Sequence, residues 1–278
     1  MPMPSPADKR RAFRALHESG CFVIPNPWNV GSAVYLQGLG FKALATTSSG
    51  YAHSLGLADG AVTRDMVLAH YRELVAATAI PINADFEGGF ADDPAGVAAN
   101  VKLCIETGVA GLSIEDFTGN EADPLYDFDL ALARVKAARA AIDEAGGDVV
   151  FTARTEGFIH GRTDMDETIR RLKAFADAGA DCLYAPGIKT REQIETVVKA
   201  VAPKPVNLLM SFAGGFTVKD IAGMGVRRIS VGGTLARVAM NAFIKSASAI
   251  ASEGSFDSFA GGITNAELNK FFNEAGAQ

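Results

Sequence analysis

One junction recurs along this chain: a helical pattern ends in glycine and an apolar run begins. It occurs at Ser19-Gly20-Cys21, Leu39-Gly40-Phe41, Thr107-Gly108-Val109, Ala178-Gly179-Ala180 and Met224-Gly225-Val226. Glycine readily takes the left-handed conformation just past the end of a helix. The runs that follow are apolar with little alternation, as in strands buried on both faces of a parallel sheet. The chain is therefore predicted to alternate helices with parallel strands.

The number of these units predicts a closed barrel. Apolar runs near residues 22, 42, 82, 111, 150, 183, 206 and 228 give eight strands. The segments between them carry apolar residues at helical spacing, and three helix starts have a capping pair: Asp164 with Glu167, Thr190 with Gln193 and Thr264 with Glu267. Continuous alternation of this kind favours a (β/α)8 TIM barrel over two doubly wound domains.

The domain organisation follows from the same pattern. All 278 residues, 1–278, form one predicted barrel domain. Residues 252–278 are a C-terminal extension, in which a Gly/Ser/Phe-rich connection over 252–262 leads to a last helix over about 264–273. That helix lies outside the barrel count and must pack against another surface.

Composition and charge exclude several classes of protein. The net charge is −6 and no long cluster of Lys or Arg occurs, which argues against a nucleic-acid surface. No uncharged apolar stretch approaches the roughly 18 to 20 residues that cross a bilayer. Residues 1–8 lack the apolar region of a secretory signal, and the three cysteines suit reduced core thiols better than a disulfide framework. We expect a soluble, cytoplasmic protein that acts on a small molecule.

Acidic residues follow the third and fourth predicted strands. Asp85 and Glu87 come after the run 81–84, and alternation places them on one side; Glu115 and Asp116 follow the run 112–114. In TIM barrels the reactive groups sit at these strand ends. Grouped carboxylates need a compensating proton or cation, and oxygen ligands without paired His or Cys favour Mg²⁺ or Mn²⁺. The alternative is that these acids cap helices or form surface ion pairs.

The other strand ends offer groups that fit an anionic substrate. Arg154 ends the fifth strand and suits bidentate binding of a carboxylate or phosphonate, or else an ion pair with Glu156 or Glu115. The loop 46–51 offers hydroxyl and N–H donors for an anion, although a plain polar loop would look the same. Residues 230–234 follow strand eight, where many barrels bind phosphate, and the competing explanation there is a helix cap. By itself, Asp59 is typical of a turn residue. His53 and His160 fall in loops of the same rim.

In their order along the chain, these motifs are specific, and the sequence resembles the isocitrate lyase/phosphoenolpyruvate mutase superfamily over essentially its whole length. The resemblance rests on Asn26-Pro27-Trp28-Asn29, Ser48-Ser49-Gly50-Tyr51, Ser54-Leu55-Gly56 with Asp59, Asp85-Phe86-Glu87-Gly88-Gly89-Phe90, Ser113-Ile114-Glu115-Asp116 and Ala153-Arg154-Thr155-Glu156.

The resemblance implies roles for single residues. It implies that Asp85 binds Mg²⁺ directly, whereas Asp59, Glu87 and Glu115 hold water molecules on the ion. Ser49, Gly50 and Tyr51 then form the cradle for the substrate carboxylate, with Arg154 completing it. Arg154 and Glu115 are the candidate catalytic residues. The implied substrates are small 2-oxo or 2-hydroxy acids, in which a C–C or P–C bond is made or broken through a stabilised enolate. The resemblance also implies a homo-oligomer, a dimer or a tetramer, with terminal helices exchanged between subunits.

Two departures from the family pattern bear on the reaction. Lyase members carry a Lys-Arg-Cys-Gly-His-type loop after strand four, whereas the loop here, 117–126, has no cysteine or lysine. Its polar residues Asn120, Glu121, Asp123 and Tyr126 are more economically explained as a solvated lid. The phosphonomutase branch has a His after strand six, where this chain has Tyr184-Ala185-Pro186-Gly187.

Several functions stay open for this reason. Within the family they are a carbon–carbon lyase, an oxaloacetate decarboxylase, and a phosphonopyruvate hydrolase or mutase. Outside these enzymes they are a protein that binds metal and oxo acid without turnover, and a phosphate-binding barrel isomerase that uses Gly232 and Gly233.

Overall fold

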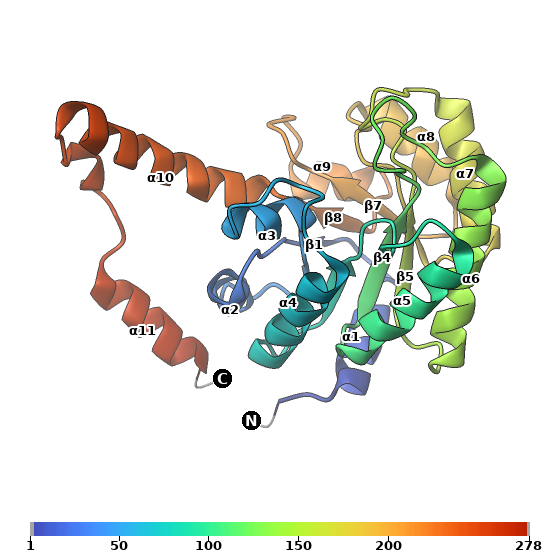
Figure 1. Cartoon of the computed structure of the whole chain (residues 1–278), viewed down its shortest axis with the longest axis horizontal. Coiled ribbons are helices and arrows are strands. Elements are labelled where there is room, and N and C mark those ends of the chain that lie inside the picture. Colours follow the sequence, from blue (N-terminus) through green and yellow to red (C-terminus); the bar gives the residue numbers. More distant parts are fainter. Residues whose placement is uncertain (1–2, 277–278) are drawn as a thin grey trace.

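Eight parallel strands surrounded by helices form the structure, a computed structural model that describes residues 3–276. The sheet order is β1-β8-β7-β6-β5-β4-β3-β2 (Figure 1). The strands are β1 (Phe22–Ile24), β2 (Leu44–Ala45), β3 (Ile82–Asp85), β4 (Gly111–Glu115), β5 (Val150–Arg154), β6 (Cys182–Tyr184), β7 (Val206–Leu209) and β8 (Arg228–Ser230). The predicted TIM barrel and its eight strands are confirmed.

Helices connect consecutive strands, as the parallel order requires. α1 (Pro6–Leu16) precedes β1, and two helices, α3 (Ser48–Ser54) and α4 (Arg64–Ala77), follow β2. The remaining connections are α2 (Val30–Gly38), α5 (Pro94–Glu106), α6 (Phe128–Glu144), α7 (Met165–Asp177), α8 (Arg191–Val201) and α9 (Val218–Gly223), with α10 (Thr234–Glu253) after β8. All three predicted capping residues accept a backbone hydrogen bond at the start of their helix. No helix among residues 3–276 combines the length and apolar character needed to span a membrane.

The barrel closes between β1 and β2 through few hydrogen bonds. The predicted second strand covered 41–45, but only Leu44 and Ala45 have strand geometry. The Ala45 N–H donates to the Pro25 carbonyl (3.1 Å), and the Asn26 amide donates to the Thr46 carbonyl (2.8 Å). Elsewhere the register is continuous: Asp85 is opposite Ser113, and Glu115 is opposite Arg154. The site residues at the ends of β3, β4 and β5 therefore lie at the same level of the barrel.

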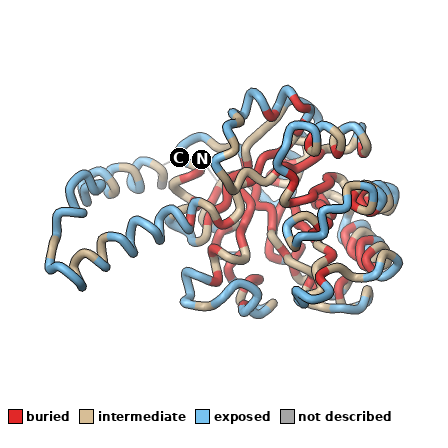
Figure 2. Tube along the Cα trace, turned by 90° about the horizontal axis from the view of Figure 1, so that it is seen from above, coloured by how far each residue is buried: buried red, intermediate tan, exposed pale blue. Residues whose placement is uncertain are grey.

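The amino-terminal end of the barrel is covered by α1. The Phe13 ring is fully buried there and packs edge-on against His17 (4.7 Å between centroids). Gly111 begins β4 beside this ring, where a Cβ would lie 2.5 Å from Phe13 Cε1 and 2.7 Å from Asn83 Oδ1. The absence of a side chain at Gly111 thus makes room for the helix that covers the barrel. Figure 2 shows the buried residues concentrated in the barrel and on the inner faces of its helices.

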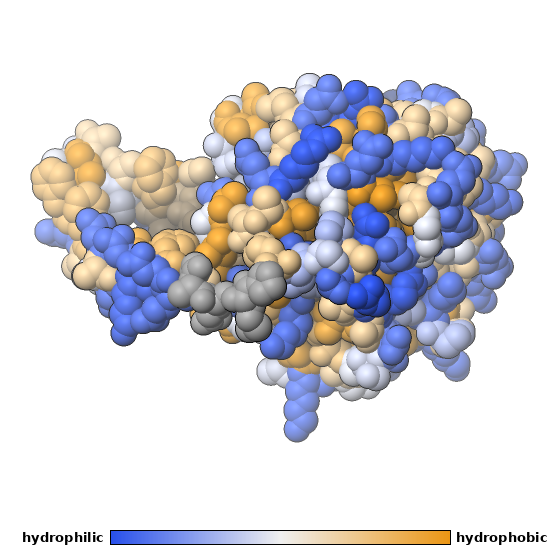
Figure 3. All heavy atoms as spheres, turned by 90° about the horizontal axis from the view of Figure 1, so that it is seen from below, coloured by the Kyte–Doolittle hydropathy of each residue, from blue (hydrophilic) through white to orange (hydrophobic). Residues whose placement is uncertain are grey.

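The C-terminal arm, comprising α10, the short η1 (Asp257–Phe259) and α11 (Asn265–Gly276), extends away from the barrel (Figure 1). Large apolar residues are exposed along α10, including Val238 at 62% and Phe243 at 66%. Figure 2 shows the arm as mainly exposed, and Figure 3 shows hydrophobic residues on its surface. α11 returns to α2, where the Phe271 ring packs on Tyr35 at 4.2 Å between centroids and fills the space beside Gly38. The predicted extension thus has a helix in the predicted place, and residues 277 and 278 lie outside the described residues.

Candidate active site

A cavity of about 630 Å³ opens at the carboxyl ends of the strands. Six acidic residues line it: Asp59, Asp85, Glu87, Glu115, Glu121 and Glu156. Three arginines also line it: Arg154, Arg228 and Arg237. The four residues predicted from the sequence to form the metal site, Asp59, Asp85, Glu87 and Glu115, therefore face one space. The acids outnumber the arginines, so the cavity suits a cationic ligand or cofactor.

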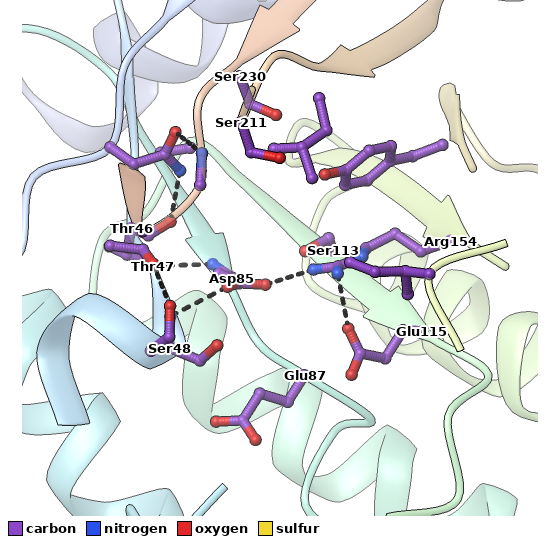
Figure 4. A pocket seen from close by; sticks show the side chains of 18 of the residues that line it. Thr46, Thr47, Ser48, Asp85, Glu87, Ser113, Glu115, Arg154, Ser211 and Ser230 are labelled. Carbon is purple, nitrogen blue, oxygen red and sulfur yellow. Dashed lines mark hydrogen bonds and ion pairs between the residues drawn. The ribbon is translucent and has the colours of Figure 1, made fainter. Parts of the chain in front are cut away.

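Asp85 is held in one orientation at the end of β3 (Figure 4). Its Oδ2 accepts the Ser48 N–H at 3.1 Å, and its Oδ1 accepts the Arg154 guanidinium at 2.6 Å. Its own N–H donates to the Thr46 hydroxyl (2.8 Å), and its carbonyl accepts the Tyr71 hydroxyl (2.6 Å). The backbone and the carboxylate are thus both fixed, as required of a group that presents an oxygen atom to a ligand.

Arg154 binds three carboxylates from the end of β5. Its Nη1 contacts Asp85 (2.6 Å), its Nη2 contacts Glu115 (3.1 Å) and its Nε contacts Glu156 (2.9 Å). Burial alone would lower the pKa of Arg154, but these carboxylates, Glu115 foremost, hold that pKa well above its usual range. The two ion pairs predicted as alternatives, with Glu115 and with Glu156, both form. Glu156 also lines the cavity, whereas the sequence indicates it only as a possible ion-pair partner of Arg154.

Glu87 reaches the cavity by a different route from the one predicted. Strand alternation was expected to place it beside Asp85, but β3 ends at Asp85, and Glu87 takes a left-handed conformation (φ 47°). Its Oε1 is buried without a hydrogen-bond partner among the described residues. Burial, with the negative charges of Asp85 and Asp59, raises the pKa of Glu87 to about 7. Backbone strain and an unpaired carboxylate oxygen are both features typical of a ligand site.

Glu115 and Asp116, adjacent in the sequence, have separate functions. Glu115 lines the cavity, and burial raises its pKa well above the usual value although Arg154 opposes the shift. Asp116 lies outside the cavity lining, accepts the Glu156 N–H (2.8 Å) and pairs with Arg171 (3.0 Å). Of the two acids predicted at this strand end, only Glu115 therefore belongs to the site.

The loop after β2 contributes less of the predicted substrate cradle than expected. Ser49 lines the cavity and its hydroxyl lies 3.3 Å from that of Thr47. The N–H groups of Gly50 and Tyr51 are bonded to the hydroxyl and carbonyl of Thr47. The Tyr51 ring stacks on His70 (3.9 Å between centroids), and its hydroxyl lies 3.4 Å from the Met66 carbonyl. In this arrangement the Tyr51 side chain supports α3 and does not line the cavity.

Two backbone amides at the end of β8 are already engaged. The N–H groups of Val231 and Gly232 both donate to Asn26 Oδ1 at 2.9 Å. Asn26 lies on the loop after β1, so this contact also ties the first and last strands together. The phosphate-binding isomerase alternative therefore loses the Gly232 amide, whereas Gly233 lines the cavity.

The donor set fits a hard divalent cation. The acidic side chains that share the cavity with Asp85 offer oxygen ligands, and the Glu87 Oε1 among them has no hydrogen-bond partner in the described chain. Among residues 3–276, no three His, Cys, Asp or Glu side chains are placed to hold one ion jointly. A site with one carboxylate ligand, and other acids at a greater distance, matches the preference of Mg²⁺ for retaining several water molecules.

A barrel with this acidic cavity is typical of TIM-barrel enzymes, whose active sites lie at this face. The family model described as phosphoenolpyruvate phosphomutase matches residues 13–251. The chain belongs to this family, within the phosphoenolpyruvate mutase/isocitrate lyase superfamily, as the resemblance of its motifs implied.

Two relatives have named activities. The 2-methylisocitrate lyase of Escherichia coli K12 is 33% identical over 186 residues, which cover 64% of this chain and 62% of that protein. The oxaloacetate decarboxylase of Rhodopseudomonas palustris CGA009 is 30% identical over 273 residues, covering 94% of this chain and 91% of that protein. These two homologues are thus enzymes that act on small organic acids.

Solved structures share the whole barrel. A protein of Burkholderia cenocepacia J2315, whose crystal structure carries a provisional lyase/mutase description, is 45% identical with a TM-score of 0.92, and 96% of each chain is covered. A phosphonopyruvate hydrolase in complex with oxalate and Mg²⁺ has a TM-score of 0.85 at 24% identity, with 97% of this chain and 96% of that chain covered. The second comparison establishes the common fold.

Proposed function

We propose that this protein is a Mg²⁺-dependent enzyme that cleaves a C–C bond in a small 2-oxo or 2-hydroxy acid, with oxaloacetate-like acids as the favoured substrates. The observation that carries the proposal is the cavity in which Asp85 and Glu115 contact Arg154 and Glu87 faces the same space. The oxaloacetate decarboxylase that aligns over 94% of this chain supports the substrate class.

The side chains divide the chemistry between them. Asp85 would hold the ion, and Asp59, Glu87 and Glu115 would orient its water molecules. When bound, Mg²⁺ would supply an electrophile for the α-oxygens of the acid. Arg154, oriented by Glu115 and Glu156, would bind the substrate carboxylate and stabilise the negative charge that develops as the bond breaks. Ser49, at the entrance to α3, would bind the other end of the acid.

The second candidate within the family is phosphonopyruvate hydrolysis or phosphoryl migration. Cleavage of a P–C bond requires positioning and charge stabilisation more than a strong base, and the cavity offers both. Tyr184, over whose ring the Arg154 guanidinium lies at 4.9 Å, occupies the region where the phosphonomutase branch has a histidine. This difference favours the C–C reaction.

A substrate panel with a matched pair of variants tests the proposal. The protein and Mg²⁺ are incubated with oxaloacetate, phosphonopyruvate, 2-methylisocitrate and substituted malates, while release of pyruvate and phosphate is followed. We expect pyruvate from oxaloacetate, and a loss of about 10³-fold or more in Asp85→Asn. Asp65→Asn, an exposed carboxylate outside the cavity, is the control. Folded Asp85→Asn protein with normal turnover would refute the proposal, and phosphate release from phosphonopyruvate alone would select the second candidate. Oxalate binding by wild type without turnover of any acid would select the binding-protein alternative.

We also propose that the C-terminal arm binds a second copy of the chain, in a dimer or tetramer. The exposed apolar side chains of α10 carry this proposal, because isolated chains rarely leave so continuous an apolar surface in water. Exchange of the terminal helix between subunits is one way to cover that surface.

A further inference from the structure

Two loops meet at the mouth of the cavity through a histidine. His160, on the loop between β5 and α7, stacks its ring on Phe117 of the loop between β4 and α6 (3.9 Å between centroids, 8° between planes). Its Nδ1 lies 3.0 Å from Glu121 Oε2 on that same loop. His160, Phe117 and Glu121 all line the cavity that contains Asp85. The imidazole is thus held on one face and at one nitrogen.

The loop that holds the histidine is itself well ordered. Phe117 forms an antiparallel bridge with Leu125, and the Thr118 N–H donates to the Pro124 carbonyl at 2.9 Å. The Asp116 carboxylate, bonded to Arg171 and to the backbone of the neighbouring loop, fixes its base. These contacts hold the backbone that places Phe117 and Glu121 beside His160, while the Glu121 side chain itself is 77% exposed.

The contact at Nδ1 determines what the other ring nitrogen can do. A carboxylate that accepts from Nδ1–H leaves Nε2 as the proton acceptor, or as the donor once the ring is protonated. No described residue hydrogen-bonds to Nε2 of His160. A histidine with an oriented Nδ1 and an unengaged Nε2 at a cavity wall is the arrangement that general acid–base catalysis uses.

We propose that His160, oriented by Glu121, is the general acid–base of the reaction and replaces the cysteine that the loop lacks. This inference rests on the proposed function. When the C–C bond of an oxaloacetate-like acid breaks, its electron pair remains on the three-carbon fragment as an enolate and CO₂ leaves. The proton on Nε2 then passes to C3 of the enolate, which gives pyruvate, and the neutral ring regains a proton from water. Glu121 is a positioning residue in this scheme.

The same step run backwards gives a test that needs no bond cleavage. A base that protonates the enolate also removes a C3 proton from pyruvate, so wild-type protein with Mg²⁺ should exchange the methyl hydrogens of pyruvate in D₂O, as followed by proton NMR. We expect His160→Asn to slow this exchange about 100-fold or more, and Glu121→Gln to slow it about 10-fold. Mg²⁺-dependent oxalate binding, measured by calorimetry, should be unchanged in both variants.

The chain offers a matched control. Asp123 is an exposed carboxylate on the same loop as Glu121, and it does not line the cavity. Asp123→Asn should therefore exchange pyruvate at the wild-type rate. His160→Gln, which keeps a polar group near the position of Nε2, provides a second variant if His160→Asn does not fold.

Each outcome separates this inference from the proposed function. Wild-type exchange by either folded His160 variant, with oxalate binding intact, overturns the role of His160 alone. Oxalate binding by wild type without any pyruvate exchange overturns it as well. Failure of wild-type protein to bind oxalate with Mg²⁺ overturns the proposed function, and the role of His160 with it.

Discussion

The buried ion pair of Asp116 and Arg171 should be the costliest to break in this protein. The side chains are 2% and 7% exposed, and their atoms lie 3.0 Å apart. Arg171 also donates to the Tyr126 carbonyl (2.9 Å), so it joins α7 to the end of the loop that carries Glu121. Arg171→Met keeps most of the apolar volume and removes the charge. The Asp116 carboxylate then stays buried with only uncharged partners, the Glu156 N–H among them.

The size of the effect follows from this uncompensated charge. Removing one partner of a buried ion pair costs about 3 to 5 kcal/mol of unfolding free energy. For a chain of this size, about 2 °C in melting temperature corresponds to each kcal/mol, so we expect a decrease of roughly 6 to 10 °C at pH 8. Adding Asp116→Asn to Arg171→Met should restore much of the loss, because the amide carries no charge.

The effect should depend on pH in a defined direction. Burial raises the pKa of Asp116, although the Glu156 N–H and Arg171 oppose the shift. Without Arg171 that pKa rises further. A carboxyl whose pKa is higher in the folded than in the unfolded state contributes stability that is lost as pH rises through the folded pKa. The Arg171→Met deficit should thus be larger at pH 8 than at pH 5.

Thermal unfolding followed by circular dichroism at both pH values checks this, with wild type measured at each. Arg170→Met is the matched control, because Arg170 is the adjacent residue, is 52% exposed and pairs with Glu167. Its cost should stay below about 1 kcal/mol. A melting temperature for Arg171→Met within 2 °C of wild type at pH 8, or a deficit that is equal at both pH values, would contradict the reasoning.

Three further predictions concern the barrel base and the arm. Gly111→Ala should lower the unfolding free energy, measured by urea titration, by about 1 to 3 kcal/mol, because the new Cβ would overlap Phe13. Gly31→Ala is the control and should cost far less, because its Cβ would lie 3.7 Å from its nearest neighbour, Asn29 Oδ1. Burial, followed by the nearby charge of Arg228, lowers the pKa of His17 to about 3. The neutral His17 ring contributes stability that is complete above pH 6.5 and is lost as pH falls toward 3. The unfolding free energy of wild type should therefore decrease by about 2 kcal/mol between pH 7 and pH 5 because of this residue. A urea midpoint that depends on pH as strongly in His17→Phe as in wild type would contradict this. Phe243→Glu should lower the sedimentation coefficient toward that of a monomer, and an unchanged value would exclude α10 from the subunit contact.

Much of the fold follows from local sequence patterns, because each unit contains a helix end, an apolar strand and a polar strand end. The same pattern located Asp85, Glu115 and Arg154, since the last residue of a buried parallel strand opens onto the site. The pattern failed at β2, where only two residues pair. It placed Glu87 in the cavity but not its backbone conformation, since a positive φ in a residue other than glycine is set by its surroundings.

Other site residues depend on contacts that no local pattern contains. Arg228 lies within an apolar run, but its guanidinium is buried inside the barrel and donates to Asn207 and Thr152. The pair of His160 and Glu121 joins residues 39 positions apart. The sequence indicates that both lie in rim loops, yet their contact depends on the shapes of two loops. These groups become apparent only when neighbouring strands bring their loops together.

Gly38 determines where the C-terminal arm can attach. The ring of Phe271 occupies the volume that a side chain at position 38 would fill. Because glycine has no Cβ, a socket for α11 forms beside Gly38. The socket lies on the outer helical layer, away from the strand ends that carry Asp85 and Arg154. Attachment of the arm and binding of an acid therefore depend on separate parts of the chain. A substitution at this position can thus change where the arm docks while the strand ends that carry Asp85 and Arg154 stay the same.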